Sequence, residues 1–227
     1  MMKLKTENVG RMYFRGSSSA NYFYAVRGLD FELEEGCVTV ITGRSGSGKT
    51  TLINMLCALL VPSEGKVLLD GNDIYSMSDK ERSVLRNRCF GIIPQGQTGL
   101  QCLTVSENVL LPLSMYGKAK GKEEKARELL EKLGIADLWD VYSNELSGGE
   151  LRRMSVARAL INAPEIIVAD EPTGDLDADT TALVMELLKK RAENGASVLI
   201  VTHDRDVLPY ADKIMSMEKG ILQETHN

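Results

Sequence analysis

Residues 43–50 read GRSGSGKT and residues 146–150 read LSGGE, and these two stretches decide the fold. The first follows an apolar segment, residues 38–41, and precedes a segment with apolar residues at helical spacing, residues 51–60. A glycine-rich loop between a strand and a helix is the context that a phosphate-binding loop requires. The second stretch is followed by an apolar run, residues 166–169, that ends in two acidic residues. This order predicts a nucleotide-binding α/β protein.

Composition excludes several other classes of protein. Of the 227 residues, 43% are hydrophobic and 26% are charged, which is ordinary for a globular chain. The net charge is -5, and no basic stripe indicates a nucleic-acid partner. The most basic stretch, residues 118–125, contains two glutamates and is expected to begin a solvated helix.

No segment approaches the ~20 apolar residues that a membrane span needs, and no apolar stretch suggests a signal peptide. We therefore expect any membrane role to come through a partner. The cysteines lack CxxC spacing and are expected to be reduced thiols of a cytosolic protein. They are Cys37, Cys57, Cys89 and Cys102.

Strand-like and helix-like segments alternate along most of the chain, which points to a mainly parallel sheet. Expected strands cover residues 3–9, 29–33, 37–42, 90–93, 165–169, 197–201, 212–217 and 220–223, with a hairpin at 65–71. Expected helices cover 51–60, 78–87 with Ser78 as the cap, 104–111, 122–133, 148–161 and 178–193. The helix-rich part, residues 96–163, is expected to be a helical subdomain inserted into an α/β core made of residues 1–95 and 164–227.

The glycine-rich loop explains how phosphate would be bound. Its glycines let the backbone direct N–H groups at phosphate oxygens, and the helix that follows adds its dipole. Lys49 supplies a positive charge for the β- and γ-phosphates, Thr50 offers a hydroxyl to magnesium, and Thr51 is placed to reach the α-phosphate. A chance glycine-rich turn is the alternative, and the flanking strand and helix argue against it. The candidate phosphate-binding residues are Gly43, Arg44, Ser45, Gly46, Ser47, Gly48, Lys49, Thr50 and Thr51.

Asp170 and Glu171 end an apolar strand, so both carboxylates are expected at the carboxyl edge of the sheet, where open α/β folds bind ligands. Asp170 would hold the magnesium shell, and Glu171 would polarise an attacking water as a general base. The alternative is a turn or capping pair before Pro172. A catalytic and metal-binding pair is favoured over a turn or cap because the chain also contains a phosphate-binding loop.

Taken together, these motifs resemble those of the ATP-binding cassette (ABC) ATPases over essentially the whole chain. LSGGE matches the family signature, residues 170–177 (DEPTGDLD) match its second acidic motif and D-loop, His203 matches the switch histidine, and Gln95 occupies the Q-loop position. Glu150 stands where the family most often has glutamine. The resemblance implies an α/β fold with a P-loop NTPase (RecA-like) core, a mainly parallel sheet, an N-terminal antiparallel β-subdomain and an inserted helical subdomain.

The resemblance also implies roles for individual residues. ATP and Mg²⁺ would be the cofactors, with Thr50, Gln95 and Asp170 near the metal. Glu171, His203 and Gln95 would serve hydrolysis. Ser147, Gly148 and Gly149 would face the γ-phosphate held by a second chain, and Asp177 would make contact across that interface. Ser147 at the start of a helix is also a plain N-cap, which is compatible with that role.

An aromatic residue upstream of the phosphate loop is expected to stack on adenine. We select Tyr13, while Phe14 and Tyr22 remain alternatives, and a packing role inside a hairpin is open for all three. The intervening segment, residues 16–21, is expected to be a surface loop or a partner contact. His226 is expected to have no role.

Residues 104–117 (TVSENVLLPLSMYG) are similar to those of lipoprotein-release, macrolide-export and cell-division cassettes. The expected partners are an integral-membrane permease and a second cassette, identical or not, at the cytoplasmic face of the membrane; no nucleic acid is expected. Leu100 and Leu103 would either dock the permease or pack the subdomain. The alternative is a soluble cassette that acts on nucleic acid or ribosomes, but the chain has neither a heptad run nor a second cassette.

Overall fold

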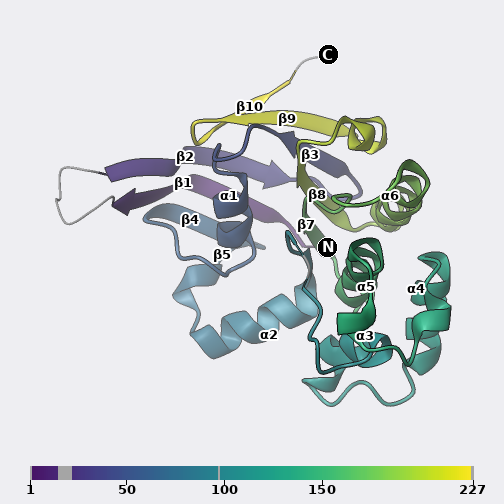
Figure 1. The fold of residues 1–227 in the computed structure, drawn as a ribbon. Coiled ribbons are helices and arrows are strands. Elements are labelled where there is room, and N and C mark those ends of the chain that lie inside the picture. The colour runs from purple at the N-terminus through teal and green to yellow at the C-terminus, as the bar shows by residue number, and fades with distance from the viewer. Residues whose placement is uncertain (1, 15–21, 97, 226–227) are drawn as a thin grey trace.

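The computed structural model describes residues 2–14, 22–96 and 98–225. The expectations for residues 16–21 and for His226 lie outside this range. Within it, the chain forms two sheets with helices on both sides of the larger one (Figure 1).

The larger sheet holds the mainly parallel core. Its strands are β3 (Val38–Thr42), β6 (Phe90–Ile93), β7 (Ile166–Asp170), β8 (Ser197–Thr202), β9 (Lys213–Glu218) and β10 (Ile221–Glu224). The order is β10-β9-β3-β8-β7-β6, with parallel pairing from β9 to β6 and antiparallel pairing between β9 and β10. Every residue of β7 and β8 is buried, as expected for parallel strands covered on both faces. The predicted sheet is confirmed.

The smaller, antiparallel sheet contains strands that are longer than the sequence suggested. It comprises β1 (Leu4–Phe14), β2 (Tyr22–Leu33), β4 (Glu64–Leu69) and β5 (Asn72–Asp73), in the order β2-β1-β4-β5. The expected strands, 3–9 and 29–33, were too short because register shifts between Thr6 and Arg11 interrupt the alternation of apolar and polar residues. Asn8 lies there at φ 49°, as in a β-bulge.

Helix α1 (Lys49–Leu56) lies between the two sheets, where its apolar residues join one hydrophobic core (Figure 1). The expected helix, 51–60, was wrong at its end. Ala58 adopts a left-handed conformation (φ 56°), and the N–H groups of Leu59 and Leu60 both donate to the carbonyl of Asn54. The helix therefore stops well before Pro62.

The opposite face of the larger sheet is covered by a second core to which helices α3 to α6 contribute. The remaining helices are α2 (Asp79–Cys89), α3 (Val105–Ser114), α4 (Glu123–Lys132), α5 (Gly148–Leu160) and α6 (Ala178–Glu193). Short 3-10 helices join them: η1 (Ile74–Ser76), η2 (Ala136–Leu138), η3 (Ser143–Glu145) and η4 (Arg205–Tyr210). Ser78 caps α2 as predicted: its hydroxyl accepts from the Glu81 backbone N–H, and the Glu81 carboxylate accepts from the Ser78 backbone N–H.

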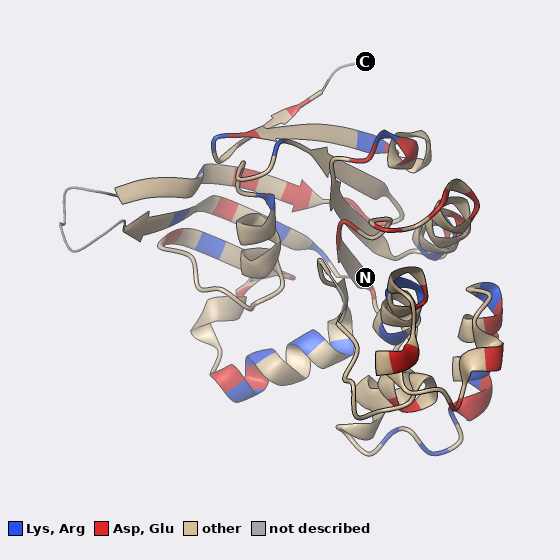
Figure 2. Ribbon diagram, viewed as in Figure 1, with Lys and Arg blue, Asp and Glu red and all other residues tan. Residues whose placement is uncertain are grey.

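Helices α3, α4 and α5 gather into one lobe (Figure 1). Charged residues are frequent on α2 and α4, whereas the strands of the larger sheet carry few (Figure 2). In the described ranges, none of the helices combines the length and the apolar character needed to cross a membrane. The subdomain boundaries at residues 96 and 163 stay a prediction.

Candidate functional site

The glycine-rich loop joins β3 to α1, and neighbouring backbone explains two of its glycines. A Cβ atom on Gly48, which lies at φ 110°, would overlap the carbonyl oxygen of Ala25. A Cβ atom on Gly43 would lie 2.5 Å from the carbonyl oxygen of Met217. Both positions therefore need glycine because other strands pack directly against the loop.

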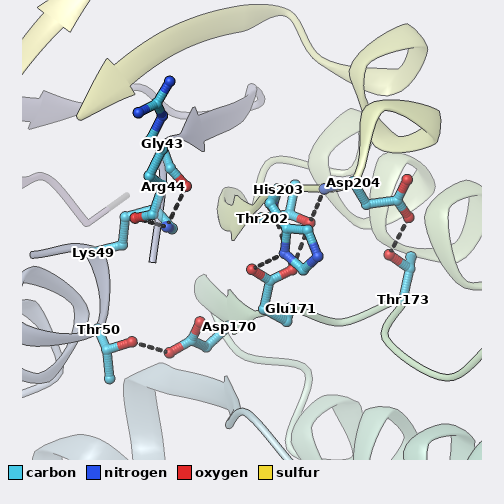
Figure 3. Close-up of polar contacts among 10 residues, drawn as sticks. All are labelled: Gly43, Arg44, Lys49, Thr50, Asp170, Glu171, Thr173, Thr202, His203 and Asp204. Atoms are coloured by element: carbon cyan, nitrogen blue, oxygen red, sulfur yellow. Dashed lines mark hydrogen bonds and ion pairs between the residues drawn. The ribbon is translucent and has the colours of Figure 1, made fainter. Parts of the chain in front are cut away.

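The Lys49 side chain lies across this loop and is 8% exposed. Its Nζ donates hydrogen bonds to the carbonyl oxygens of Gly43 (2.6 Å) and Arg44 (3.2 Å), as Figure 3 shows. The Oγ atom of Ser47 is buried and has no hydrogen-bond partner in the described structure. The loop thus holds a cation and an unpaired hydroxyl, both suited to an anionic ligand.

Thr50 and Asp170 meet at the carboxyl edge of the larger sheet. Thr50 Oγ1 donates a 2.9 Å hydrogen bond to Asp170 Oδ2 (Figure 3). Asp170 is 5% exposed, and this burial raises the pKa of its carboxyl group. A buried carboxylate beside a hydroxyl is a set of hard oxygen donors.

Glu171 lies next to Asp170 and directs its side chain toward β8. Its carboxylate accepts a 2.8 Å hydrogen bond from Thr202 Oγ1 and lies 2.7 Å from His203 Nδ1 (Figure 3). The hydrogen bond to Glu171 raises the pKa of the exposed His203 imidazole. Glu171 itself adopts a left-handed backbone (φ 51°), which is uncommon for a non-glycine residue. Such conformations cluster at functional sites.

One cavity of about 670 Å³ collects most of the predicted site residues. Its lining includes Tyr13, residues 43–51, Gln95, Asp170, Glu171 and His203. Sequence reasoning missed two lining residues, Phe23 and Ala25. The rings of Phe23 and Tyr13 stack with their centroids 5.8 Å apart. Neither Phe14 nor Tyr22, the two alternatives for the aromatic position, is part of the described lining.

The pairing of β1 with β2 is what brings Phe23 to the site, because Phe23 lies directly opposite Tyr13 in the register. A signal was present in the sequence, since the aromatic runs at 13–14 and 22–24 flank a short polar loop as in a hairpin.

The signature residues lie outside this cavity. Ser147 is the N-cap of α5 and is exposed, and its hydroxyl accepts from the Glu150 backbone N–H (3.4 Å). Glu150 completes the capping box by accepting from the Ser147 backbone N–H and hydroxyl, and these bonds lower the pKa of its carboxyl. Asp177 is likewise the exposed N-cap of α6. The structure therefore leaves Ser147, Gly148, Gly149 and Asp177 apart from the pocket that the other candidates share.

A buried arginine that the sequence did not single out links α5 to the Gln95 segment. Arg152 is 5% exposed, and its Nη1 donates a 2.8 Å hydrogen bond to the carbonyl oxygen of Pro94. Burial lowers the pKa of its guanidinium group, and the nearby carboxylates of Asp175, Asp170 and Glu171 partly oppose this shift. An arginine within a predicted helix is normally expected to be exposed to solvent, so no signal in the sequence indicated this contact.

A phosphate loop, a carboxylate pair and a histidine at one edge of a parallel sheet define a P-loop nucleoside-triphosphatase. Comparison with models of known protein families shows which family of P-loop proteins this chain belongs to. A family model described as "ABC transporter" matches residues 26–174, so the chain belongs to the ABC transporter family of ATP-binding cassettes, which are ATPases.

Curated relatives extend over the whole chain. An uncharacterized ABC transporter ATP-binding protein of Methanocaldococcus jannaschii is 37% identical over 99% of both chains. The lipoprotein-releasing system ATP-binding protein LolD of Aquifex aeolicus is 38% identical, covering 96% of this chain and 94% of LolD. The macrolide export ATP-binding/permease protein MacB of Campylobacter fetus is 38% identical over 98% of this chain, which spans 34% of MacB.

Solved structures agree with this assignment. A dimeric bacterial ABC transporter cassette has a TM-score of 0.90 and 33% sequence identity, with 99% of each chain covered. A dimeric post-hydrolysis state of a cassette bound to ADP and Pi has a TM-score of 0.89 at the same identity and coverage.

Proposed function

We propose that this chain is the ATP-binding and ATP-hydrolysing subunit of an ABC transporter, and that closure of a cassette dimer drives a separate membrane permease. One observation carries the proposal: the phosphate loop, Asp170, Glu171 and His203 line a single cavity while the signature helix presents its N-terminus outside it. The pocket of one chain is then completed by the signature of another.

Nucleotide binding follows from the cavity lining. The stacked Tyr13 and Phe23 rings offer an aromatic platform for adenine. The loop amides and the Lys49 Nζ atom would meet the phosphates, with Lys49 exchanging its contacts to the Gly43 and Arg44 carbonyls for phosphate oxygens. Gln95 and Thr51 lie on the same lining.

Magnesium fits the oxygen donors at the sheet edge. Asp170 is a buried carboxylate with a raised pKa, and a divalent cation would favour its charged form. Thr50 and Asp170 would hold the metal, with Gln95 nearby, and Mg²⁺ would neutralise charge on the phosphates. Oxygen donors of this kind suit Mg²⁺.

Hydrolysis would depend on Glu171. Its carboxylate is fixed by Thr202 and by His203, so it is oriented to accept a proton from an attacking water. The exposed His203 imidazole lines the same cavity and can donate toward the γ-phosphate. No covalent intermediate is needed, because positioning and electrostatic stabilisation supply the rate in phosphoryl transfer.

Dimerisation is supported by the exposed N-cap of α5 and by the dimeric state of the similar cassettes. Ser147 caps a 13-residue helix that begins with Gly148 and Gly149, and the N-terminus of such a helix attracts anions. In a head-to-tail pair, this N-terminus would cover the nucleotide of the second chain, and Asp177 would lie at the interface.

A permease partner is supported by the resemblance to LolD and MacB. A groove of about 270 Å³ lies between α2, α3 and α5, and its lining includes Leu59, Met115 and Tyr116. Leu59 and Met115 are 54% and 66% exposed. Exposed apolar residues around a groove suit a short amphipathic helix of a membrane protein. Leu100 is 46% exposed and is not part of the described lining of this groove.

Affinity purification from detergent-solubilised membranes tests the proposal. The expected result is that the chain retains an integral-membrane protein, and that Met115→Glu weakens this retention without loss of ATP hydrolysis by the isolated chain. Retention of ribosomes or nucleic acid in place of a membrane protein would refute the transport function.

A further inference from the structure

We propose that the turn between β9 and β10 positions the phosphate loop, and that Gly220 is the positioning residue for nucleotide binding. This inference rests on the proposed nucleotide site. It concerns a segment far beyond the loop in the sequence, because Gly220 follows Ser47 by 173 residues (220 − 47).

The turn has a conformation that few residues adopt. Glu218 pairs with Ile221, which leaves Lys219 and Gly220 as a two-residue connection. Their φ angles are 49° and 81°, as in a type I′ turn. This geometry exposes the peptide groups of Gly220 to neighbouring segments.

Both peptide groups of Gly220 are used by other parts of the chain. Its N–H donates a 2.9 Å hydrogen bond to the carbonyl oxygen of Ser47 in the phosphate loop. Its carbonyl oxygen accepts a 2.9 Å hydrogen bond from the N–H of Arg27 in β2. The turn therefore connects the loop to the strand that carries Phe23.

The bond to Ser47 determines where the next amide of the loop points. In a planar trans peptide, the C=O and N–H groups point in opposite directions. Because the Ser47 carbonyl faces the turn, the N–H of Gly48 is directed away from the turn, and Gly48 lines the cavity of the proposed nucleotide site. A hydrogen bond at the back of the loop thus orients a phosphate-binding amide at its front.

The loop and the turn pack closely against the same stretch of backbone. The Ala25 carbonyl oxygen lies between Gly48 and Gly220, and a Cβ atom on Gly220 would approach it to 2.8 Å. Met217, at 1% exposure, contributes its carbonyl oxygen next to Gly43. A side chain at position 220 would therefore displace backbone that also contacts the loop.

A second two-residue turn, between β4 and β5, offers a matched control. Asp70 and Gly71, between β4 and β5, have φ angles of 51° and 79°, and a Cβ atom on Gly71 would meet nothing within 4 Å. Asparagine tolerates a positive φ better than other residues with a side chain. Gly71→Asn and Gly220→Asn therefore both place asparagine at a positive φ, and we expect only Gly220→Asn to disturb the phosphate loop.

Calorimetric titration with ADP, at a temperature where every variant is folded by circular dichroism, tests the inference. We expect Gly220→Asn to weaken ADP binding at least ~5-fold, the effect of losing one hydrogen bond of about 1 kcal/mol, and Gly71→Asn to leave it within ~2-fold of wild type. Equal affinity of Gly220→Asn and wild type would overturn the inference, and so would an equal loss in both variants. If wild type itself does not bind ADP, the proposed nucleotide site fails and this inference fails with it.

A measurement on the wild-type protein covers the case in which Gly220→Asn does not fold. Hydrogen exchange of the Gly220 amide should slow when ADP is added, because the loop and the turn are rigidified together. The Asn72 amide, which follows the turn between β4 and β5 as Ile221 follows the turn between β9 and β10, should not respond. An unchanged Gly220 amide at saturating ADP would contradict the proposal.

Discussion

Glu171→Gln is the change that most directly tests the proposed chemistry, because the structure shows what it would preserve. The carboxylate accepts hydrogen bonds from Thr202 Oγ1 and from the backbone N–H of His203 (3.4 Å) with one oxygen, and its other oxygen contacts His203 Nδ1. Glutamine keeps one acceptor oxygen for the first two groups and can donate its amide N–H to an unprotonated Nδ1. The variant should therefore fold with the same contacts.

The expected magnitudes follow from this geometry. Since no contact is lost outright, the free energy of unfolding should change by no more than about 1 kcal/mol, the net value of one hydrogen bond. The turnover rate should fall ~100-fold or more, because glutamine cannot accept the proton of an attacking water and general-base catalysis contributes ~10²–10⁴-fold. ATP binding should persist.

Three assays measure these effects: phosphate release at saturating ATP, thermal unfolding, and size-exclusion chromatography with ATP. We expect slow turnover, near-normal stability and an ATP-dependent dimer. A variant that hydrolyses ATP at more than a tenth of the wild-type rate would exclude Glu171 as the base. A variant that binds ATP but stays monomeric at high protein concentration would refute the closed-dimer mechanism for the isolated chain.

Three further predictions concern neighbouring residues. Lys49→Ala should weaken ATP binding by ~10-fold or more, the loss of a charge-assisted hydrogen bond, and unchanged affinity by calorimetry would count against the loop assignment. Thr50→Val should reduce the loss of ATP affinity that EDTA causes in wild type, because the hydroxyl proposed to bind Mg²⁺ is removed; an undiminished EDTA effect would exclude that role. The His203 imidazole should titrate in NMR above its ordinary pKa of about 6.5, and Glu171→Gln should lower the midpoint, since the carboxylate raises that pKa. The His203–Glu171 pair therefore stabilises the fold below pH ~6.5, and this contribution is lost as the pH rises through the pKa of His203 in the folded protein. An equal titration midpoint in wild type and in Glu171→Gln would refute the pairing.

Local sequence was sufficient to predict those features that depend on only a few neighbouring residues. The phosphate loop, the N-caps at Ser78 and Ser147 and the buried strand that ends in Asp170 were all visible, because apolar periodicity, capping residues and glycine spacing act over a few residues. The class of protein followed from their order along the chain.

Strand ends in the smaller sheet could not be predicted in the same way. A bulge at Asn8 breaks the two-residue alternation of β1, and pairing with β2 restores the strand beyond it. For that reason the register that opposes Tyr13 to Phe23 emerged only from the folded sheet.

The sequence by itself predicted a phosphate-binding loop at residues 43–50 and a buried strand that ends in two carboxylates. Tertiary structure alone decided that Arg152 contacts Pro94 and that the Gly220 N–H donates to the Ser47 carbonyl. The physical reason is distance along the chain, because each of these contacts joins segments that meet only when the sheets and helices pack. A local sequence pattern does not specify which carbonyl oxygen will accept a hydrogen bond from a donor far away in the chain.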